Sequence, residues 1–102
     1  MLETREANGE VIIGSVKLVH AAGMHARPAV KLTKLAKKFR AQISVRADAT
    51  AEWINAKSVS KIMALRAARD STMEFKASGE DAEAAVAALV ELVAADFPDT
   101  DP

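Results

Sequence analysis

The sequence contains no cysteine, and this absence excludes several kinds of chemistry at once. Disulfide bonds, thiol nucleophiles and thiolate metal sites all need a cysteine sulfur. The 102 residues also contain no apolar run near the roughly 20 residues that span a bilayer. Residues 1–9 hold no apolar signal core, which gives no support for secretion. We therefore expect a cytoplasmic protein without membrane insertion.

An excess of charge of one sign is absent too, and aromatic residues are scarce. Fourteen Lys and Arg balance fourteen Asp and Glu, so the formal net charge is zero. Such a protein lacks a general electrostatic attraction to nucleic acid or to an acidic membrane. One tryptophan and three phenylalanines give little support for a binder of single-stranded nucleic acid. These counts favour side-chain chemistry or protein docking over nucleic-acid binding.

Half of the residues are hydrophobic, which suffices for the packed core of one domain of this length. The polar ends at 1–9 and 98–102 predict flexible tails, and the domain is expected at 10–97.

Charge is segregated along the chain although it sums to zero. Basic residues gather at 31–40 and, with Lys57 and Lys61, could form a positive docking face around a site on the same helix. The alternative is that they only complement the helix dipole on a solvated face.

The hydrophobic period changes several times between the tails. Apolar and polar residues alternate, as in strands, at 11–19, 42–47, 52–56 and 73–77. Spacings of three and four predict helices at about 26–39, 58–63 and 82–97. The order β-α-β-β-α-β-α predicts an α+β fold with a four-stranded sheet, one face of which is covered by helices and the other wet.

Two details of this pattern predict where side chains lie. Ser58 is a good N-cap for the short second helix, which is then expected to bury Val59, Ile62 and Met63. Trp53 alternates with Ile54, so it is expected to point away from the helices, at the edge or surface of the sheet.

The heptapeptide GMHARPA at residues 23–29 carries the most chemistry. Pro28 is favoured in a first helical turn, which places His25 at or beside the N-cap. The first-turn amides of Ala26 and Arg27 then point toward the His25 ring, and a helix N-terminus with such amides holds phosphate well. Arg27 adds a planar cation for phosphate oxygens, and neutral histidine is a nucleophile. The alternative is a capping or surface histidine beside a solvated arginine.

His20 is the other histidine, and we interpret it as a structural or solvent-facing residue at a strand end. A metal site built from His20 and His25 is not expected. The two are five residues apart across a glycine turn, and no carboxylate lies nearby in the sequence.

The second informative segment is NAKSVSKIM at residues 55–63. Besides capping the helix, the Ser58 hydroxyl is a candidate phosphorylation site. A phosphate there would gain from the helix dipole and add about −1.5 to −2 charge to the adjoining surface. Ser60 is a competing hydroxyl, but the local pattern centres on Ser58.

Both segments resemble the HPr family, the histidine-containing phosphocarriers of the bacterial phosphoenolpyruvate phosphotransferase system. GMHARPA is similar to the family's active-site signature, and residues 55–62 are similar to its regulatory-serine segment. The resemblance covers about residues 10–97 and implies the HPr-like open-faced β-sandwich, with a four-stranded antiparallel sheet and three helices on one face. The sequence of residues 23–28 and the Phe97-Pro98 ending resemble the nitrogen-related NPr branch of the family more than its sugar-transport branch.

The resemblance also implies roles for individual residues. His25 would accept a phosphoryl group on Nδ1 from phosphorylated Enzyme I and pass it to an EIIA-type protein, and Arg27 and the first-turn amides would stabilise that group. In some bacteria an HPr kinase/phosphorylase modifies the serine that Ser58 matches. The positions that match the partner-docking face are Met24, Val59, Lys61 and Met63. No cofactor and no metal are implied, and a monomer is expected.

Two other classes of function stay open. One is a regulator whose phosphorylation at His25 or Ser58 is read by a partner protein without onward transfer. The other is a ligand- or RNA-binding domain that uses the basic helix, which would leave both motifs unexplained.

Overall fold

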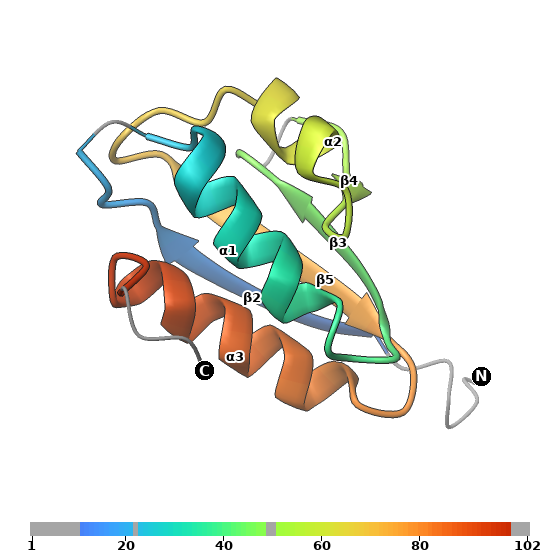
Figure 1. The fold of residues 1–102 in the computed structure, drawn as a ribbon. Coiled ribbons are helices and arrows are strands. Elements are labelled where there is room, and N and C mark those ends of the chain that lie inside the picture. Colours follow the sequence, from blue (N-terminus) through green and yellow to red (C-terminus); the bar gives the residue numbers. More distant parts are fainter. Residues whose placement is uncertain (1–10, 22, 49–50, 99–102) are drawn as a thin grey trace.

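The structure is a computed structural model that describes residues 11–21, 23–48 and 51–98 (Figure 1). Its elements along the chain are β2 (Val11–Lys17), α1 (Ala26–Ala36), β3 (Gln42–Arg46), β4 (Ile54–Asn55), α2 (Val59–Ala64), β5 (Thr72–Ser78) and α3 (Ala82–Ala94). The strands form one antiparallel sheet in the order β2-β5-β3-β4. All three helices cover the same face, α1 and α3 side by side and α2 beside β4 (Figure 1). The expected open-faced sandwich is confirmed.

The core lies between the sheet and the helices, as the alternating pattern predicts. In β5 every second residue, Met73, Phe75 and Ala77, is buried. The residues of α3 expected to face inward are all buried: Ala82, Ala85, Val86, Leu89 and Val93. Helix α3 approaches β2 so closely that a Cβ on Gly14 would lie 2.7 Å from a methyl carbon of Val86. Any larger residue at this crossing would therefore require Val86 to move.

Several expected boundaries or faces differ from the structure. The first strand ends at Lys17 rather than Val19, and the last helix ends at Ala94 rather than near Phe97. Helix α1 ends at Ala36 rather than near Phe39, because Lys38 and Phe39 donate to acceptors three residues back, in the tighter turns common at helix ends. Strand β4 is only two residues long, because Asn55 accepts a hydrogen bond from the Lys57 amide and turns the chain toward α2. In α2 only Ile62 is buried, and Met63 is 40% exposed, since one narrow stripe of this short helix meets the core.

The face of the sheet without helices carries mostly polar and charged side chains, as expected, together with the exposed Val11 and Ile13 of β2. Trp53 lies there between two cations, with the Arg46 guanidinium carbon 4.3 Å and the Lys76 ammonium 4.5 Å from its ring centroid. Arg46 also pairs with Glu74 across the strands at 2.6 Å. Trp53 therefore contributes to the surface of the sheet, as its alternation predicts.

The α1–β3 connection is fixed to the start of α3 by one carboxylate. The backbone amides of Arg40 and Ala41 donate to Asp81 at 2.9 and 2.8 Å. The hydrogen bond from Arg40, helped by that from Ala41, lowers the pKa of the Asp81 carboxyl. Its charged form is therefore favoured in the folded protein.

The two expected tails lie outside the described residues, except for Pro98. The Pro98 carbonyl accepts a hydrogen bond from the Lys31 ammonium at 2.7 Å. The chain that leaves α3 thus contacts α1. Across the described ranges, no helix is both long and apolar enough to cross a membrane.

Candidate functional site

His25 is the N-cap of α1, with an extended backbone and no capping hydrogen bond from its side chain. The Ala29 amide donates to the His25 carbonyl at 2.9 Å, in the manner of the first turn of a helix. Ala26 and Arg27 come before the first residue whose amide donates within the helix, so their amides have no acceptor in the preceding turn of α1. Pro28, the third residue of this turn, has no N–H. The start of α1 therefore presents two backbone donors beside an exposed imidazole ring.

A glycine turn holds His25 in this place. Gly23 has a φ of +73°, and a Cβ there would lie 2.6 Å from the Ala67 carbonyl oxygen. The next amide, that of Met24, donates to the same oxygen at 2.9 Å. The turn therefore requires glycine for its backbone angle and for its close approach to the 67–69 segment.

Met24 does not fit the docking role expected for it. Its side chain is only 5% exposed and belongs to the hydrophobic core. The backbone bond to Ala67 turns Met24 inward while His25, Ala26 and Arg27 stay exposed. Met24 therefore anchors the loop from inside.

The second histidine lies next to the first, which the sequence analysis missed. The ring centroids of His20 and His25 are 5.2 Å apart. His20 Nδ1 lies 2.8 Å from Asp96 Oδ1, and the Phe97 ring meets the His20 ring edge-on at 5.9 Å. Asp96 is 76 residues from His20, so no local spacing could have signalled this contact.

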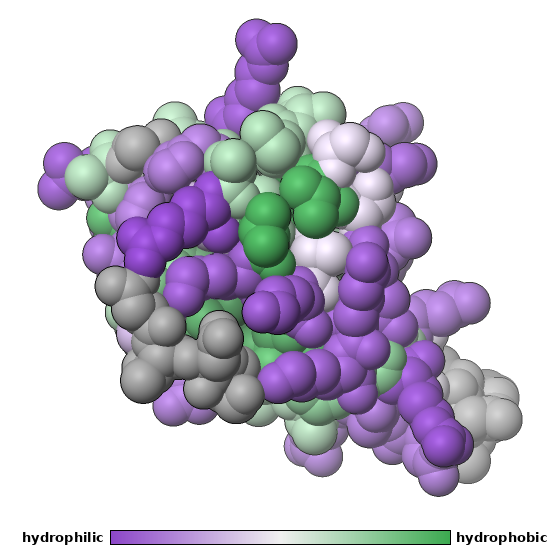
Figure 2. Space-filling view, in the orientation of Figure 1, coloured by the Kyte–Doolittle hydropathy of each residue, from purple (hydrophilic) through white to green (hydrophobic). Residues whose placement is uncertain are grey.

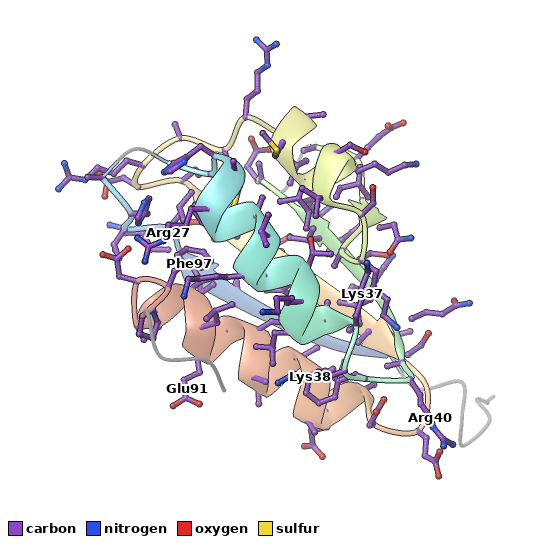
Figure 3. All side chains as sticks on the ribbon, viewed as in Figure 1. Arg27, Lys37, Lys38, Arg40, Glu91 and Phe97 are labelled. Carbon is purple, nitrogen blue, oxygen red and sulfur yellow. The ribbon has the colours of Figure 1, made fainter. Side chains whose placement is uncertain are left out.

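The positive face expected around His25 is smaller than the sequence suggested. A shallow hollow lined by Ala26, Arg27, Val30, Lys31 and Lys34 begins at the site. Figure 3 shows Lys37, Lys38 and Arg40 toward the other end of α1 from Arg27. A helix of 11 residues is about 16 Å long, so these three side chains are not neighbours of His25.

The second motif forms the start of α2. The Ser58 hydroxyl accepts a hydrogen bond from the Lys61 amide at 3.3 Å, which confirms it as the N-cap. The same oxygen lies 3.3 Å from the Ser60 hydroxyl. Lys61 is exposed and Val59 is half-buried. The hydrophobic area near the top of Figure 2 lies over α1 and α2, which expose Val30 and Met63.

The described residues include no group of three His, Asp or Glu side chains placed to hold a metal ion. The chemistry visible at the start of α1 is that of a nucleophilic ring, two amides and a guanidinium. This set suits a phosphoryl group, which offers one electrophilic atom and several anionic oxygens.

Comparisons with known proteins agree with this geometry. A family model described as "PTS HPr component phosphorylation site" matches residues 13–95. The chain is 36% identical over 83 residues to "Phosphocarrier protein NPr" of Escherichia coli K12, which covers 81% of this chain and 91% of that protein. It is 40% identical over 74 residues, 72% of its length, to a "Multiphosphoryl transfer protein" of Vibrio cholerae.

The lengths of these relatives differ greatly. The chain spans 18% to 20% of the multiphosphoryl transfer proteins that it matches. A crystal structure of HPr-C-His from Thermoanaerobacter tengcongensis superposes with a TM-score of 0.78 and 32% identity, and the match covers 87% of this chain and 98% of that one. The similarity therefore extends over nearly the whole fold.

Proposed function

Because the chain belongs to the HPr family of phosphocarriers of the phosphotransferase system, we propose that His25 accepts a phosphoryl group from phosphorylated Enzyme I and passes it to an EIIA-type protein. One observation carries the proposal: His25 is the N-cap of α1, its own side chain does not cap the helix, and its exposed ring lies beside the amides of the first turn. The protein acts as a carrier in the cytoplasm, and its partner enzymes contribute the rest of each active site.

The transfer is a direct displacement at phosphorus. The lone pair of the neutral His25 ring, on Nδ1, attacks phosphorus in line. The new N–P bond forms as the bond between phosphorus and its carrier atom on Enzyme I breaks, and that electron pair returns to Enzyme I. In the next step a nucleophile of an EIIA-type protein attacks phosphorus, the N–P bond breaks, and its electron pair returns to His25.

Arg27 and the amides of Ala26 and Arg27 stabilise the charge on the phosphoryl oxygens. Donors that are fixed before the reaction stabilise such charge without any cost of reorganisation. The rigid start of α1, with Pro28 in its first turn, provides that fixed arrangement.

The proposed docking surface consists of Val59, Lys61 and Met63 on α2, together with Val30 on α1. Val30 and Met63 are 45% and 40% exposed. An apolar centre beside Lys61 suits short-lived docking to acidic partners, with an interface near or below about 1,200 Å².

Ser58 is the proposed regulatory site, modified where the cell has an HPr kinase/phosphorylase. A phosphate on Ser58 keeps an acceptor at the start of α2 and adds negative charge beside Lys57 and Lys61. We expect Ser58→Asp to weaken Enzyme I docking and to slow uptake at low salt. An uptake rate equal to that of the wild type would contradict this.

The test of the carrier function is an intact mass after reaction with phosphoenolpyruvate and Enzyme I, with His25→Ala in parallel. We expect one phosphoryl adduct that mild acid removes and that is absent from the variant. Sugar-branch and nitrogen-branch Enzyme I are tried separately, and an EIIA-type protein is then added to detect onward transfer. No adduct with either enzyme overturns the proposal, whereas an adduct without onward transfer favours a regulator read by a partner.

A further inference from the structure

The site described above includes a histidine that the proposed transfer does not use. The rings of His20 and His25 have centroids 5.2 Å apart and planes inclined by 38°. The Gly23 amide donates to the His20 carbonyl at 2.9 Å, which folds the chain back and brings the two rings together. A phosphoryl group on His25 is therefore carried beside a second imidazole.

Asp96 decides which nitrogen of His20 carries the hydrogen. His20 Nδ1 lies 2.8 Å from Asp96 Oδ1. Because an ionised carboxylate only accepts hydrogen bonds, the hydrogen is on Nδ1. Neutral His20 then has its lone pair on Nε2, and protonated His20 has a second N–H there, available to an oxygen nearby.

The backbone beyond α3 is bent into an unfavourable form where it supplies these contacts. Asp96 and Phe97 have φ angles of +62° and +51°, in the left-handed region that glycine usually occupies after a helix. Both side chains contact His20, Asp96 by the hydrogen bond and Phe97 by its ring edge. Glycine at either position would relieve the backbone but remove a contact to His20.

The charges around His20 show what its protonation would change. With neutral His20, the Asp96 carboxylate and a phosphoryl group on His25 are two negative charges that repel each other. A protonated His20 places a positive charge between them. Asp96 and His25 contact His20 directly. The segments that hold these contacts, or that bond to the chain next to His20, also carry Arg27, Lys31, Arg69 and Asp70.

We propose that His20, held by Asp96, takes a proton from solvent when His25 is phosphorylated and donates its Nε2–H to a phosphoryl oxygen. This inference rests on the proposed carrier function and deepens it. His20 forms no covalent bond to phosphorus and is a positioning residue. Its stabilisation of the phosphorylated state is present at low pH and is lost as the pH rises through the range where imidazole loses its proton.

The direct test needs no variant of His20. The ¹⁵N chemical shifts of both ring nitrogens of His20 are measured at pH 7 before and after phosphorylation of His25. We expect the protonated fraction of His20 to rise on phosphorylation. In Asp96→Asn, which keeps a neutral acceptor, we expect a smaller rise.

A second readout is the phosphorylated fraction at equilibrium with Enzyme I and phosphoenolpyruvate. His20→Asn can still bond to Asp96 but cannot be protonated. We expect it to shift the equilibrium constant about tenfold toward the unphosphorylated form at pH 6, and little at pH 8.5. A purely structural role of His20 would give a loss that does not depend on pH.

The outcomes separate the two proposals. If His25 is phosphorylated but the ¹⁵N shifts of His20 do not change, the role of His20 is overturned and the carrier function stands. The same holds if the phosphorylated fraction of His20→Asn depends on pH as that of the wild type does. No adduct on the wild-type protein overturns the carrier function and this inference with it.

Discussion

The two helices that carry the sequence motifs begin in different ways. At α2 the Ser58 hydroxyl accepts a hydrogen bond from the Lys61 amide, so the helix start is closed by its own N-cap. At α1 the N-cap is His25, whose side chain caps nothing, and the amides of Ala26 and Arg27 precede the first helical bond. An N-cap side-chain bond stabilises a helix, whereas phosphate and other anions bind at helix starts through the first-turn amides.

The difference predicts that loss of a phosphate donor at the start of α1 slows the transfer, whereas loss of the Ser58 cap lowers stability. Among variants that keep His25, the largest effect is expected for Arg27→Ala. Losing one fixed donor to transferring oxygens slows phosphoryl uptake by about 10²-fold, with stability little changed. Stopped-flow measurement of uptake from phosphorylated Enzyme I checks this.

The matched control for Arg27 is Lys34→Ala, which removes a cation from the same hollow farther along α1. It should alter uptake much less than Arg27→Ala does. Equal losses in the two variants would mean that α1 contributes only its general positive charge.

Gly23→Ala tests the turn that holds the α1 site. The added Cβ meets the Ala67 carbonyl oxygen at 2.6 Å in a backbone conformation unfavourable for alanine. We expect a loss of about 1–3 kcal/mol in the free energy of unfolding and slower phosphoryl uptake by the folded fraction. Urea unfolding and uptake kinetics measure the two effects.

Gly79→Ala is the control, because Gly79 also has a positive φ but lies beside Ala41. It should lower stability and leave uptake by the folded protein unchanged. If Gly79→Ala slowed uptake as much as Gly23→Ala, general destabilisation would explain both.

Ser58→Ala tests the N-cap at the start of α2. Loss of the N-cap bond to Lys61 should cost about 1 kcal/mol of stability while the basal uptake rate stays the same. Ser60→Ala removes a hydroxyl two residues on that does not cap the helix and should cost less. Urea unfolding of the two variants tests this, and equal stability losses would argue against the cap.

The smallest effect concerns Asp81, which lies at the start of α3 and not at that of α1 or α2. Its pKa is lowered in the folded state by the Arg40 amide, so its charge stabilises the fold above the unfolded pKa of about 3.9. That contribution is lost as the pH falls through the folded-state pKa. The difference in melting temperature between wild type and Asp81→Asn should therefore shrink between pH 7 and pH 3, by calorimetry, with uptake unaffected at pH 7.

The sequence predicted those features that depend on neighbours along the chain. The alternation in β5 and the inner face of α3 follow from local period, and His25, Ala26 and Arg27 share one helix start. The burial of Met24 was not predictable, because it depends on a bond to Ala67 from a distant loop.

The contact between His20 and Asp96 shows the same limit more sharply. It needs the end of α3 to bend back over a loop 76 residues earlier in the chain. No periodic pattern contains that information, since left-handed backbone at Asp96 and Phe97 is set by tertiary packing rather than by propensity.

The central claim is that the uncapped start of α1, and not the capped start of α2, receives the phosphoryl group. Amide ¹H–¹⁵N spectra of the uniformly labelled protein before and after phosphorylation test it most directly. We predict the largest shifts at Ala26 and Arg27, moving as amides do when they donate to an anion, and a small shift at Lys61. Unmoved amides at Ala26 and Arg27, or the largest shifts at the start of α2, would contradict the account.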